Sequence, residues 1–282
     1  MVSAACDDVA DGFASLNGGT AGGRGGTEVT VTTLNDLQRD TITVSPAGEE
    51  LRVSSNKTII GLGSNAAISM GGFGIHGVKN VIIRNLRITN PGDPDTSDHD
   101  GIQADTSSNI WIDHCHFESG GDGLVDLRKD TTFWTVSNTI FRNHDKAFGI
   151  GWTNNVVAQG TIHHSLFDRT NQRNPSADNL LHAHMYNNYM TGVTSYGHYV
   201  RGSTNARIEN VYFHNTSNPV TVDAEGTVTC RGNIYNGTTG DSVENQGTSF
   251  DPTKYYHYTL DPTEDVPSIV QANAGPKASV CS

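Results

Sequence analysis

The chain lacks the features of a membrane protein, a nucleic-acid-binding protein or a zinc protein. None of its apolar runs approaches the length of a membrane span, and the first residues, MVSAACDD, contain no hydrophobic signal region. Only 17% of the 282 residues are charged, and the 18 Lys and Arg are scattered instead of forming a basic stripe. With a net charge of −12, the chain is not expected to have a nucleic acid or a membrane as its partner.

Cysteine is also scarce. The four cysteines, Cys6, Cys115, Cys230 and Cys281, form no CxxC motif, which argues against zinc or redox chemistry. An even number suits an oxidising compartment, and three pairings are possible. Cys230 with Cys281 would hold the C-terminal tail and Cys6 with Cys115 the N-terminus; four buried free thiols are the alternative. We expect that a signal peptide has been removed ahead of Met1.

Glycine and small polar residues are what the chain has in quantity. It contains 31 Gly, and Asn, Thr and Ser dominate its polar residues, which favours turns and short strands over helix interiors. A length of 282 residues is normal for one elongated all-β domain, so we expect 1–282 to be a single domain. Residues 11–27 are loop-like, and residues 29–40 predict a short strand followed by a helix start at Thr33.

A repeat runs through the chain. Seven segments share apolar residues, then an Asn or His, then a small or apolar residue and a large apolar one: IIRNLRI (82–88), WIDHCHF (111–117), TVSNTIF (135–141), IHHSLF (162–167), MYNNYM (185–190), IENVYF (208–213) and CRGNIY (230–235). The Asn or His anchors are spaced by 29, 24, 26, 23, 23 and 23 residues: Asn85, His114, Asn138, His164, Asn187, Asn210 and Asn233. Asn suits such a position because it tolerates the left-handed conformation, and its amide can bond the equivalent amide one coil away.

This period predicts an all-β fold, a right-handed single-stranded parallel β-helix with core coils at about 52–240. A sandwich or a propeller is the alternative, but propeller blades need about 40–50 residues, roughly twice this period. Residues 241–282 are irregular and aromatic. We expect them to pack along the solenoid and cover one face, with a short helix in VPSIVQANAG (266–275).

Four aspartates recur about one coil apart. Asp98 and Asp100 lie in SDHDGIQ, and Asp122 and Asp126 lie in GDGLVDLR, 22–28 residues later. Residues one coil apart lie roughly 4.8 Å from each other, so Asp100, Asp122 and Asp126 are expected to converge at one surface point. Their charges repel one another unless a hard divalent cation such as Ca²⁺ binds among them. The alternative is that they are ordinary turn residues.

Basic residues follow at similar steps. Lys146 comes 20 residues after Asp126 and Arg173 comes 27 after Lys146, and Arg128 and Arg201 extend the ridge. The alternative is solvated charge or ion pairs with nearby aspartates. An acidic metal site beside a basic ridge suits β-elimination in a uronic acid polymer, in which the C5 proton is removed and the O4 substituent is expelled. Ca²⁺ and Lys can neutralise the charge that develops at the carboxylate.

The base that takes the C5 proton is not evident from the residues alone. Histidine is favoured on general grounds, and the candidates are His114, His116, His144, His163 and His164. Arginine would be a surprising base because it essentially never loses its proton in proteins.

The segments SDHDGIQ, NIWIDHCHF, GDGLVDLR, HDK and NQRNP together resemble the pectate lyase family of polysaccharide lyases, in its extracellular bacterial branch. The resemblance extends from GFASLNGGT (12–20) to YYHYTLDPTEDVPSIV (255–270). It implies a right-handed parallel β-helix, Ca²⁺ dependence, an extracellular location and cleavage of α-1,4-linked polygalacturonate, an acidic polysaccharide of plant cell walls.

The resemblance also implies roles for single residues. The primary Ca²⁺ ligands match Asp100, Asp122 and Asp126, and a further Ca²⁺ that arrives with substrate matches Asp98. The catalytic base matches Arg173 in place of a histidine, the cation at the substrate carboxylate matches Lys146, and positions for other uronate groups match Arg128 and Arg201. The WIDH stretch, with Asp113 and His114, matches a structural segment, and His114 is expected to be buried.

One position departs from the family pattern. The family usually carries a second Arg five residues after the catalytic one, and here Asp178 stands there, in RNPSAD. A carboxylate cannot anchor a substrate carboxylate, so Asp178 is expected to pair with Arg173 or Arg201 or to contact a sugar hydroxyl. Partly methylated pectin and other polyuronates then become alternatives to unmodified polygalacturonate.

Two further functions stay open beside a secreted, monomeric lyase. A β-helical hydrolase of the polygalacturonase type would need a pair of carboxylates and no metal, and Asp122 and Asp126 could serve. A non-catalytic pectin-binding solenoid would bind the polymer without forming any product.

Overall fold

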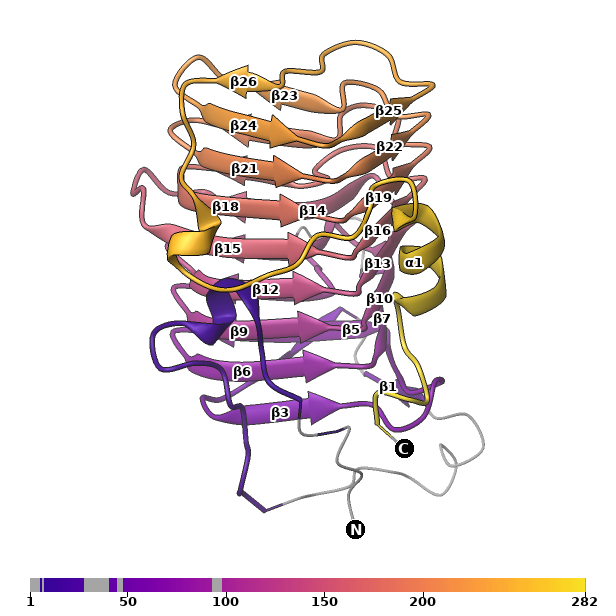
Figure 1. Ribbon diagram of the computed structural model, residues 1–282. Coiled ribbons are helices and arrows are strands. Elements are labelled where there is room, and N and C mark those ends of the chain that lie inside the picture. The colour runs from indigo at the N-terminus through magenta and orange to yellow at the C-terminus, as the bar shows by residue number, and fades with distance from the viewer. Residues whose placement is uncertain (1–5, 7, 28–40, 45–47, 93–97, 282) are drawn as a thin grey trace.

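Three strands recur in each turn of the chain and form three long sheets (Figure 1). The computed structural model describes residues 6, 8–27, 41–44, 48–92 and 98–281. The strand and helix start predicted for 29–40 lie outside these residues. Within them, the predicted all-β parallel β-helix is confirmed.

The strands of each sheet follow the chain in order. Sheet A consists of β1 (Thr41–Thr43), β4 (Ala67–Ser69), β7 (Arg87–Asn90), β10 (His116–Gly120), β13 (Ile140–Arg142), β16 (Leu166–Asp168), β19 (Tyr189–Thr191), β22 (Tyr212–His214) and β25 (Ile234–Asn236). Sheet B consists of β2 (Glu49–Arg52), β5 (Gly71–His76), β8 (Ile102–Asp105), β11 (Gly123–Arg128), β14 (Lys146–Gly151), β17 (Ser176–Asp178), β20 (His198–Arg201) and β23 (Val220–Val222). Sheet C consists of β3 (Lys57–Ile60), β6 (Lys79–Arg84), β9 (Ser108–Asp113), β12 (Thr132–Ser137), β15 (Ala158–His163), β18 (Leu180–Tyr186), β21 (Asn205–Glu209), β24 (Thr227–Arg231) and β26 (Asn245–Gln246).

Neighbouring coils are joined by parallel pairing throughout, except that β26 runs antiparallel to β24. In Figure 1 the strands of sheet C point to the right across the front while the chain climbs from β3 to β24, with sheet A at the right and β5 and β14 behind. This sense of winding is right-handed, as expected for parallel crossovers.

The corner between sheets C and A is where the predicted anchors lie. Six of the seven have a left-handed backbone, with φ between +46° and +58°: Asn85, His114, Asn138, His164, Asn187 and Asn210. The backbone N–H of Asn187 donates to the Glu209 carbonyl of the next coil at 3.0 Å, and the other anchors repeat this bond. In the last copy the prediction was wrong by one residue, because Gly232, at φ +60°, follows Arg231 as Asn210 follows Glu209.

The side-chain amides of the anchors do not bond one another as predicted. Asn85 Nδ2 donates to the Gly61 and Gly63 carbonyls, and Asn187 Nδ2 donates to the Asn210 and Asp261 carbonyls. The corner is therefore held by backbone bonds between coils, and the amides tie it to neighbouring loops and to the C-terminal tail.

Side chains that point into the solenoid form one apolar core along its length. Parallel register places like residues above one another, so Phe117, Phe141 and Phe167 stack with ring centroids 5.7 and 4.8 Å apart. Each coil alone cannot bury such a ring, and stacking buries it on both sides.

Both ends of the chain pack on the outside of the solenoid, as predicted for the tail (Figure 1). The 3-10 helix η2 (Gly12–Ser15) lies on sheet C, where Phe13 N donates to Thr161 Oγ1 at 3.1 Å. The tail adds η3 (Pro252–Lys254) and the predicted short helix, α1 (Val266–Asn273), which packs Val266 and Val270 against sheet A. No helix among the described residues is long and apolar enough to cross a membrane.

The cysteines pair differently from the two bonds named above. Cys6 bonds Cys281 and joins the two ends of the chain, while Cys115 and Cys230 are free. The Cys230–Cys281 and Cys6–Cys115 bonds were therefore wrong, and so was the alternative of four free thiols. Cys115 cannot reach Cys6 because it is fully buried in the core of its coil.

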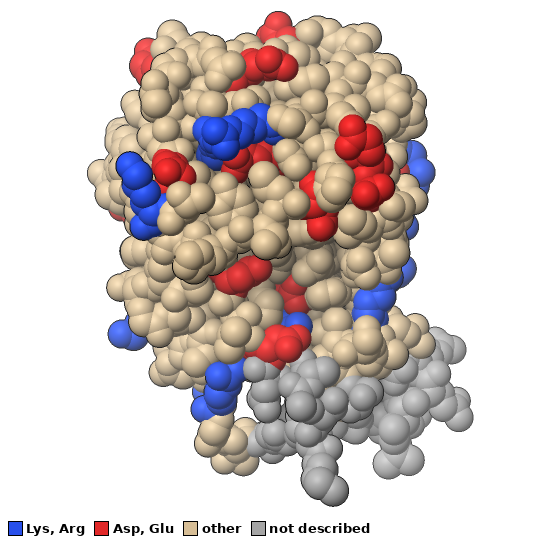
Figure 2. All heavy atoms as spheres, in the orientation of Figure 1, with Lys and Arg blue, Asp and Glu red and all other residues tan. Residues whose placement is uncertain are grey.

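The face of the molecule in Figure 2 carries both signs of charge. Lys and Arg are interspersed with Asp and Glu, and no continuous basic patch crosses this face. One open hollow of about 270 Å³ lies by Leu51 and Phe73, and another of about 360 Å³ lies by His164 and Tyr258.

Candidate active site

Three carboxylates meet at the start of two neighbouring strands of sheet B. Asp98 and Asp100 precede β8 and Asp122 precedes β11, and one oxygen of each lies within 4.8 Å of the others. Asp126, on β11 itself, lies beside this cluster and is not one of its three members. A Cβ built on Gly123 would be 2.8 Å from Asp100 Oδ1 and 3.2 Å from Asp126 Oδ1. Because Gly123 has no side chain, the space between the two carboxylates stays open.

The inner carboxylates are buried and poorly compensated. Asp100 is fully buried; its Oδ1 accepts the Gly123 N–H at 2.7 Å and its Oδ2 accepts Gln103 Nε2 at 3.3 Å. Burial raises the pKa of Asp100 to about 6 despite these bonds. Burial and the neighbouring Asp100 also raise the pKa of Asp126 well above its usual range. Two such groups take up a proton or a cation.

The donor set fits a hard divalent cation. The clustered ligands are carboxylate oxygens alone, with Asp100 held rigidly at the base and Asp98 and Asp122 more open to solvent. Ca²⁺ prefers oxygen ligands and accepts their irregular geometry.

Two cations from the next coils reach the same point. Lys146 opens β14, in register with Gly123, and its Nζ contacts Asp122 Oδ1. Arg173 precedes β17, and its Nη1 lies 3.8 Å from Asp122 Oδ2 and 3.6 Å from Asp126 Oδ2. This Nη1 is buried and has no hydrogen-bond partner in the described part of the chain. Acidic and basic residues that are distant in sequence are thus neighbours near the N-terminal ends of the strands of sheet B.

Arg128 is held between carboxylates. Its Nε lies 3.0 Å and its Nη2 3.4 Å from Asp105, while its Nη1 lies 3.1 Å from both oxygens of Asp98. Burial opposes the charge of Arg128, but the bonds to Asp105 and Asp98 raise its pKa. Sequence reasoning missed Asp105, although it stands one coil before Arg128 in the sequence and pairs with it in register.

Asp178 and Arg201 lie further along the same column of sheet B. Arg128 on β11 pairs in register with Gly151 on β14, and Asp178 on β17 pairs with Arg201 on β20. These four residues follow one another across the strands of sheet B. Among the described residues no ion pair joins Asp178 to Arg173 or to Arg201. Burial raises the pKa of Asp178, the charge of Arg201 lowers it, and Asp223 raises it again. The Arg201 guanidinium lies over the Tyr199 ring, 5.2 Å from its centroid.

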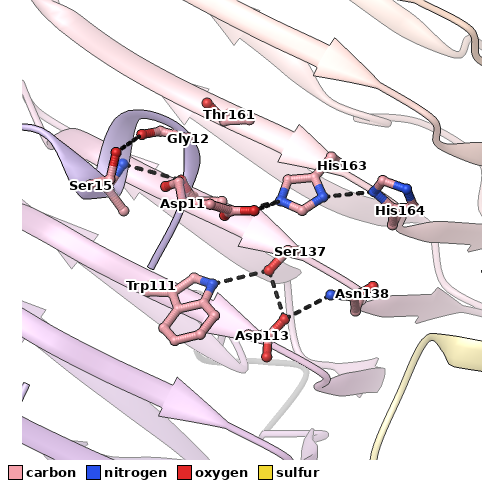
Figure 3. Close-up of polar contacts among 12 residues, drawn as sticks. Asp11, Gly12, Ser15, Trp111, Asp113, Ser137, Asn138, Thr161, His163 and His164 are labelled. Carbon is pink, nitrogen blue, oxygen red and sulfur yellow. Dashed lines mark hydrogen bonds and ion pairs between the residues drawn. The ribbon is translucent and has the colours of Figure 1, made fainter. Parts of the chain in front are cut away.

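Most of the candidate histidines lie elsewhere. His114, His163 and His164 lie at the sheet C side, where His163 and His164 join Asp11 (Figure 3), and His116 begins β10 in sheet A. Only His144 of the five is near the acidic cluster, with its Nε2 2.9 Å from the Asp122 carbonyl. The other four histidines, His114, His116, His163 and His164, lie on other sides of the solenoid and are poor candidates for the base.

Comparison with known proteins agrees with this arrangement. A family model described as pectate lyase matches residues 39–279. The chain is 33% identical to a pectate trisaccharide-lyase of Thermotoga sp., over 97% of this chain and 90% of that protein. The chain belongs to the pectate lyase family. It is thus an enzyme of the polysaccharide lyase class.

Other pectate lyases share the sequence and the fold. Pectate lyase plyB of Emericella nidulans is 37% identical over 72% of this chain and 68% of its own. A pectate lyase of Bacillus, solved in complex with trigalacturonate, is 27% identical, with a TM-score of 0.76 over 95% of this chain and 98% of that one. The chain therefore shares its overall fold with a solved pectate lyase.

Sequence reasoning also passed over Trp152, which lies near Arg173 in the pectate lyase fold. It follows β14 directly, and the Arg173 guanidinium lies 5.0 Å from the centroid of its indole ring. The available signal was its spacing, 24 residues after Arg128 and 21 before Arg173, which is one coil from each.

Proposed function

We propose that this pectate lyase is a secreted, monomeric enzyme that cleaves α-1,4-linked polygalacturonate by Ca²⁺-assisted β-elimination. The observation that carries the proposal is the meeting of Arg173 and Lys146 with the carboxylates of Asp122 and Asp126, beside the Asp98, Asp100 and Asp122 cluster. The products are oligogalacturonides with a C4–C5 double bond at the new end.

The proposed metal site consists of Asp100, Asp122 and Asp126, with Asp98 toward a further Ca²⁺ at the substrate. Bound Ca²⁺ would neutralise the uronate carboxylate and so favour loss of the C5 proton. Asp98 and Asp122 support this role because they are partly exposed and close to buried Asp100.

Arg173 is proposed as the base and Lys146 as the cation at the carboxylate. Arg173 in its neutral guanidine form takes the C5 proton and becomes a guanidinium. The electron pair of the C5–H bond forms the C4–C5 double bond, and the C4–O4 bond breaks with its electron pair left on O4, which takes a proton from water. Positive charge nearby stabilises the charge that develops on the uronate. A guanidinium is almost wholly protonated at neutral pH, so we expect activity to rise toward alkaline pH.

Arg128, Arg201 and Asp178 are proposed to contact neighbouring sugars. Arg128 would offer Nη1 to a uronate group once it leaves Asp98, while Asp105 retains its other side. Asp178 sits next to Arg201 in register and adds a negative charge there. A methyl-esterified unit or a sugar hydroxyl suits that position better than a second carboxylate, so we expect partly methylated pectin to be accepted.

The test is a panel of polygalacturonate, pectins of graded methylation and other polyuronates, followed by ultraviolet absorbance with Ca²⁺ or with a chelator. We expect absorbing products that require Ca²⁺ and that disappear in Arg173→Ala. Loss of a general base typically costs about 10²- to 10⁴-fold in rate. New reducing ends without absorbance, unaffected by chelator, would identify a hydrolase instead, and binding without any product would identify a pectin-binding solenoid.

A further inference from the structure

Trp152 is the exposed tryptophan of this protein. Of the three tryptophans, Trp111 and Trp134 are 5% and 1% exposed, whereas Trp152 is 46% exposed. It follows β14 with a left-handed backbone, at φ +51°. An exposed indole beside charged side chains offers an apolar surface to a ligand bound there.

The indole of Trp152 packs against Gly149 on the outer surface of sheet B. A Cβ built on Gly149 would be 2.2 Å from Trp152 Cη2 and 2.6 Å from its Cζ3. The same position would be 2.6 Å from Asp126 Oδ1. Gly149 pairs in register with Asp126 on one side and with Ser176 on the other. The absence of a side chain at 149 thus lets the ring lie against the strand, next to the carboxylate that faces Arg173.

The ring and the carboxylates bound Arg173 on different sides. The guanidinium carbon lies 5.0 Å from the indole centroid, within the range of a cation–π contact. Nη1 of Arg173 faces Asp122 and Asp126 at 3.8 and 3.6 Å. Neither carboxylate is within 3.5 Å of Nη1, which has no hydrogen-bond partner among the residues that the structure describes. These carboxylates alone therefore do not fix the guanidinium.

We propose that Trp152 is a positioning residue for Arg173 and offers an apolar surface to the substrate bound beside it. The indole keeps the guanidinium in one place, and its exposed part packs on the C–H face of a bound sugar ring. Binding grooves commonly combine aromatic walls with a few directed polar groups. This inference rests on the proposed function, and it adds a contact that does not distinguish a uronate from its methyl ester.

The first test measures access to Trp152 directly by acrylamide quenching of tryptophan fluorescence. In the wild type one tryptophan should be quenched readily, and Trp152→Phe should remove that component. Trigalacturonate with Ca²⁺, added to an Arg173→Lys variant that we expect to lack the base, should protect the component from acrylamide. Binding of trigalacturonate measured by calorimetry without any protection would overturn the substrate contact.

The second test separates positioning from folding. Trp152→Ala should lower kcat on polygalacturonate about 10- to 100-fold, since small misplacement of a catalytic group has effects of this order, and Trp152→Phe should restore most of it. Ca²⁺ affinity and the thermal midpoint should stay close to wild type. The matched control is Leu181→Ala, which truncates an apolar side chain 40% exposed on sheet C; its kcat should not change.

The outcomes keep the two proposals apart. A wild-type enzyme that is active, with Trp152→Ala within twofold of it in kcat, would overturn the positioning role. A wild type without ultraviolet-absorbing products on any polyuronate would refute the proposed function. In that case protection of Trp152 by bound trigalacturonate would still support the contact with sugar, and binding without protection would overturn it.

Discussion

Asp113 should be among the most important single carboxylates for stability. It is 1% exposed on the outer side of sheet C, beneath the N-terminal segment. Its oxygens accept bonds from Arg84 Nε at 2.9 Å, Ser137 Oγ at 2.7 Å and Asn138 Nδ2 at 3.0 Å, and His114 Nδ1 lies 2.7 Å away. Figure 3 shows Asp113 facing Ser137 and Asn138, with Trp111 bonded to the same hydroxyl. We predict that Asp113→Asn destabilises the fold strongly.

The magnitude follows from the charge that the network holds. Burial opposes ionisation, but the bond to His114 and the charge of Arg84 lower the pKa of Asp113 from 3.8 to about 2. That difference corresponds to about 2 kcal/mol in favour of the charged form. Among the described residues, the substitution also leaves Arg84, which is 2% exposed, with Asp8 as its one remaining charged partner, at 3.0 Å. Breaking a buried pair in this way costs about 3–5 kcal/mol, which is roughly 5–8 °C in Tm for a chain of this length.

The assay is thermal and denaturant unfolding followed by circular dichroism, with Glu118→Gln as control. Glu118 also pairs with an arginine, Arg87, at 3.0 Å, but that arginine is 52% exposed, so its loss should cost at most about 1 kcal/mol. Folded Asp113→Asn should keep its lyase activity, because the residue lies on sheet C and the site on sheet B. A stability within 1 kcal/mol of wild type, or loss of activity without loss of stability, would refute this reasoning.

Three further predictions concern acid, thiols and calcium. Burial lowers the pKa of His116 and of His164 to about 4, so their stabilisation is complete above the unfolded value of about 6.5 and is lost as pH falls toward 4. Relative to a variant with both histidines replaced by glutamine, the free energy of unfolding of the wild type should therefore decline by up to about 1.4 kcal/mol per pH unit for each group between about pH 6.5 and 4. The comparison cancels the opposite contribution of Asp100 and Asp126, whose pKa values are raised, and a constant difference between the two proteins would contradict this. Burial raises the pKa of both free thiols to about 12, so a disulfide reagent should find almost no reactive thiol in the native protein and two after denaturation without reductant; four would exclude the Cys6–Cys281 bond. Lys146→Met should tighten Ca²⁺ binding about 2- to 5-fold without substrate, since Nζ competes for Asp122 and a partly exposed ion pair contributes up to about 1 kcal/mol. Calorimetry measures this, and Lys129→Met, whose lysine pairs with Asp105 instead, should leave the affinity unchanged.

The sequence alone was enough to predict the β-helix and which acidic and basic residues come together on sheet B. In a solenoid, contact between coils repeats with the period of the chain, so residues one period apart become neighbours wherever the repeat holds. That is why the spacing of Asp100, Asp122, Lys146 and Arg173 pointed to one place on sheet B. The left-handed corners could be predicted for the same reason, since Asn and His recur there.

Only the tertiary structure decided contacts that depend on exact register or on segments outside the repeat. Coil lengths vary from 22 to 29 residues between corners, so the last corner fell on Gly232 and not on Asn233. The Cys6–Cys281 bond joins two ends 275 residues apart that pack outside the coils, where no period guides prediction. The contact between Trp152 and Arg173 likewise depends on exact packing. Trp152 follows the end of β14, its ring lies on Gly149, and Arg173 comes from the next coil. Periodic contacts can be counted along a chain, whereas the path of a loop or a terminus is determined by packing against surfaces that only the folded molecule presents.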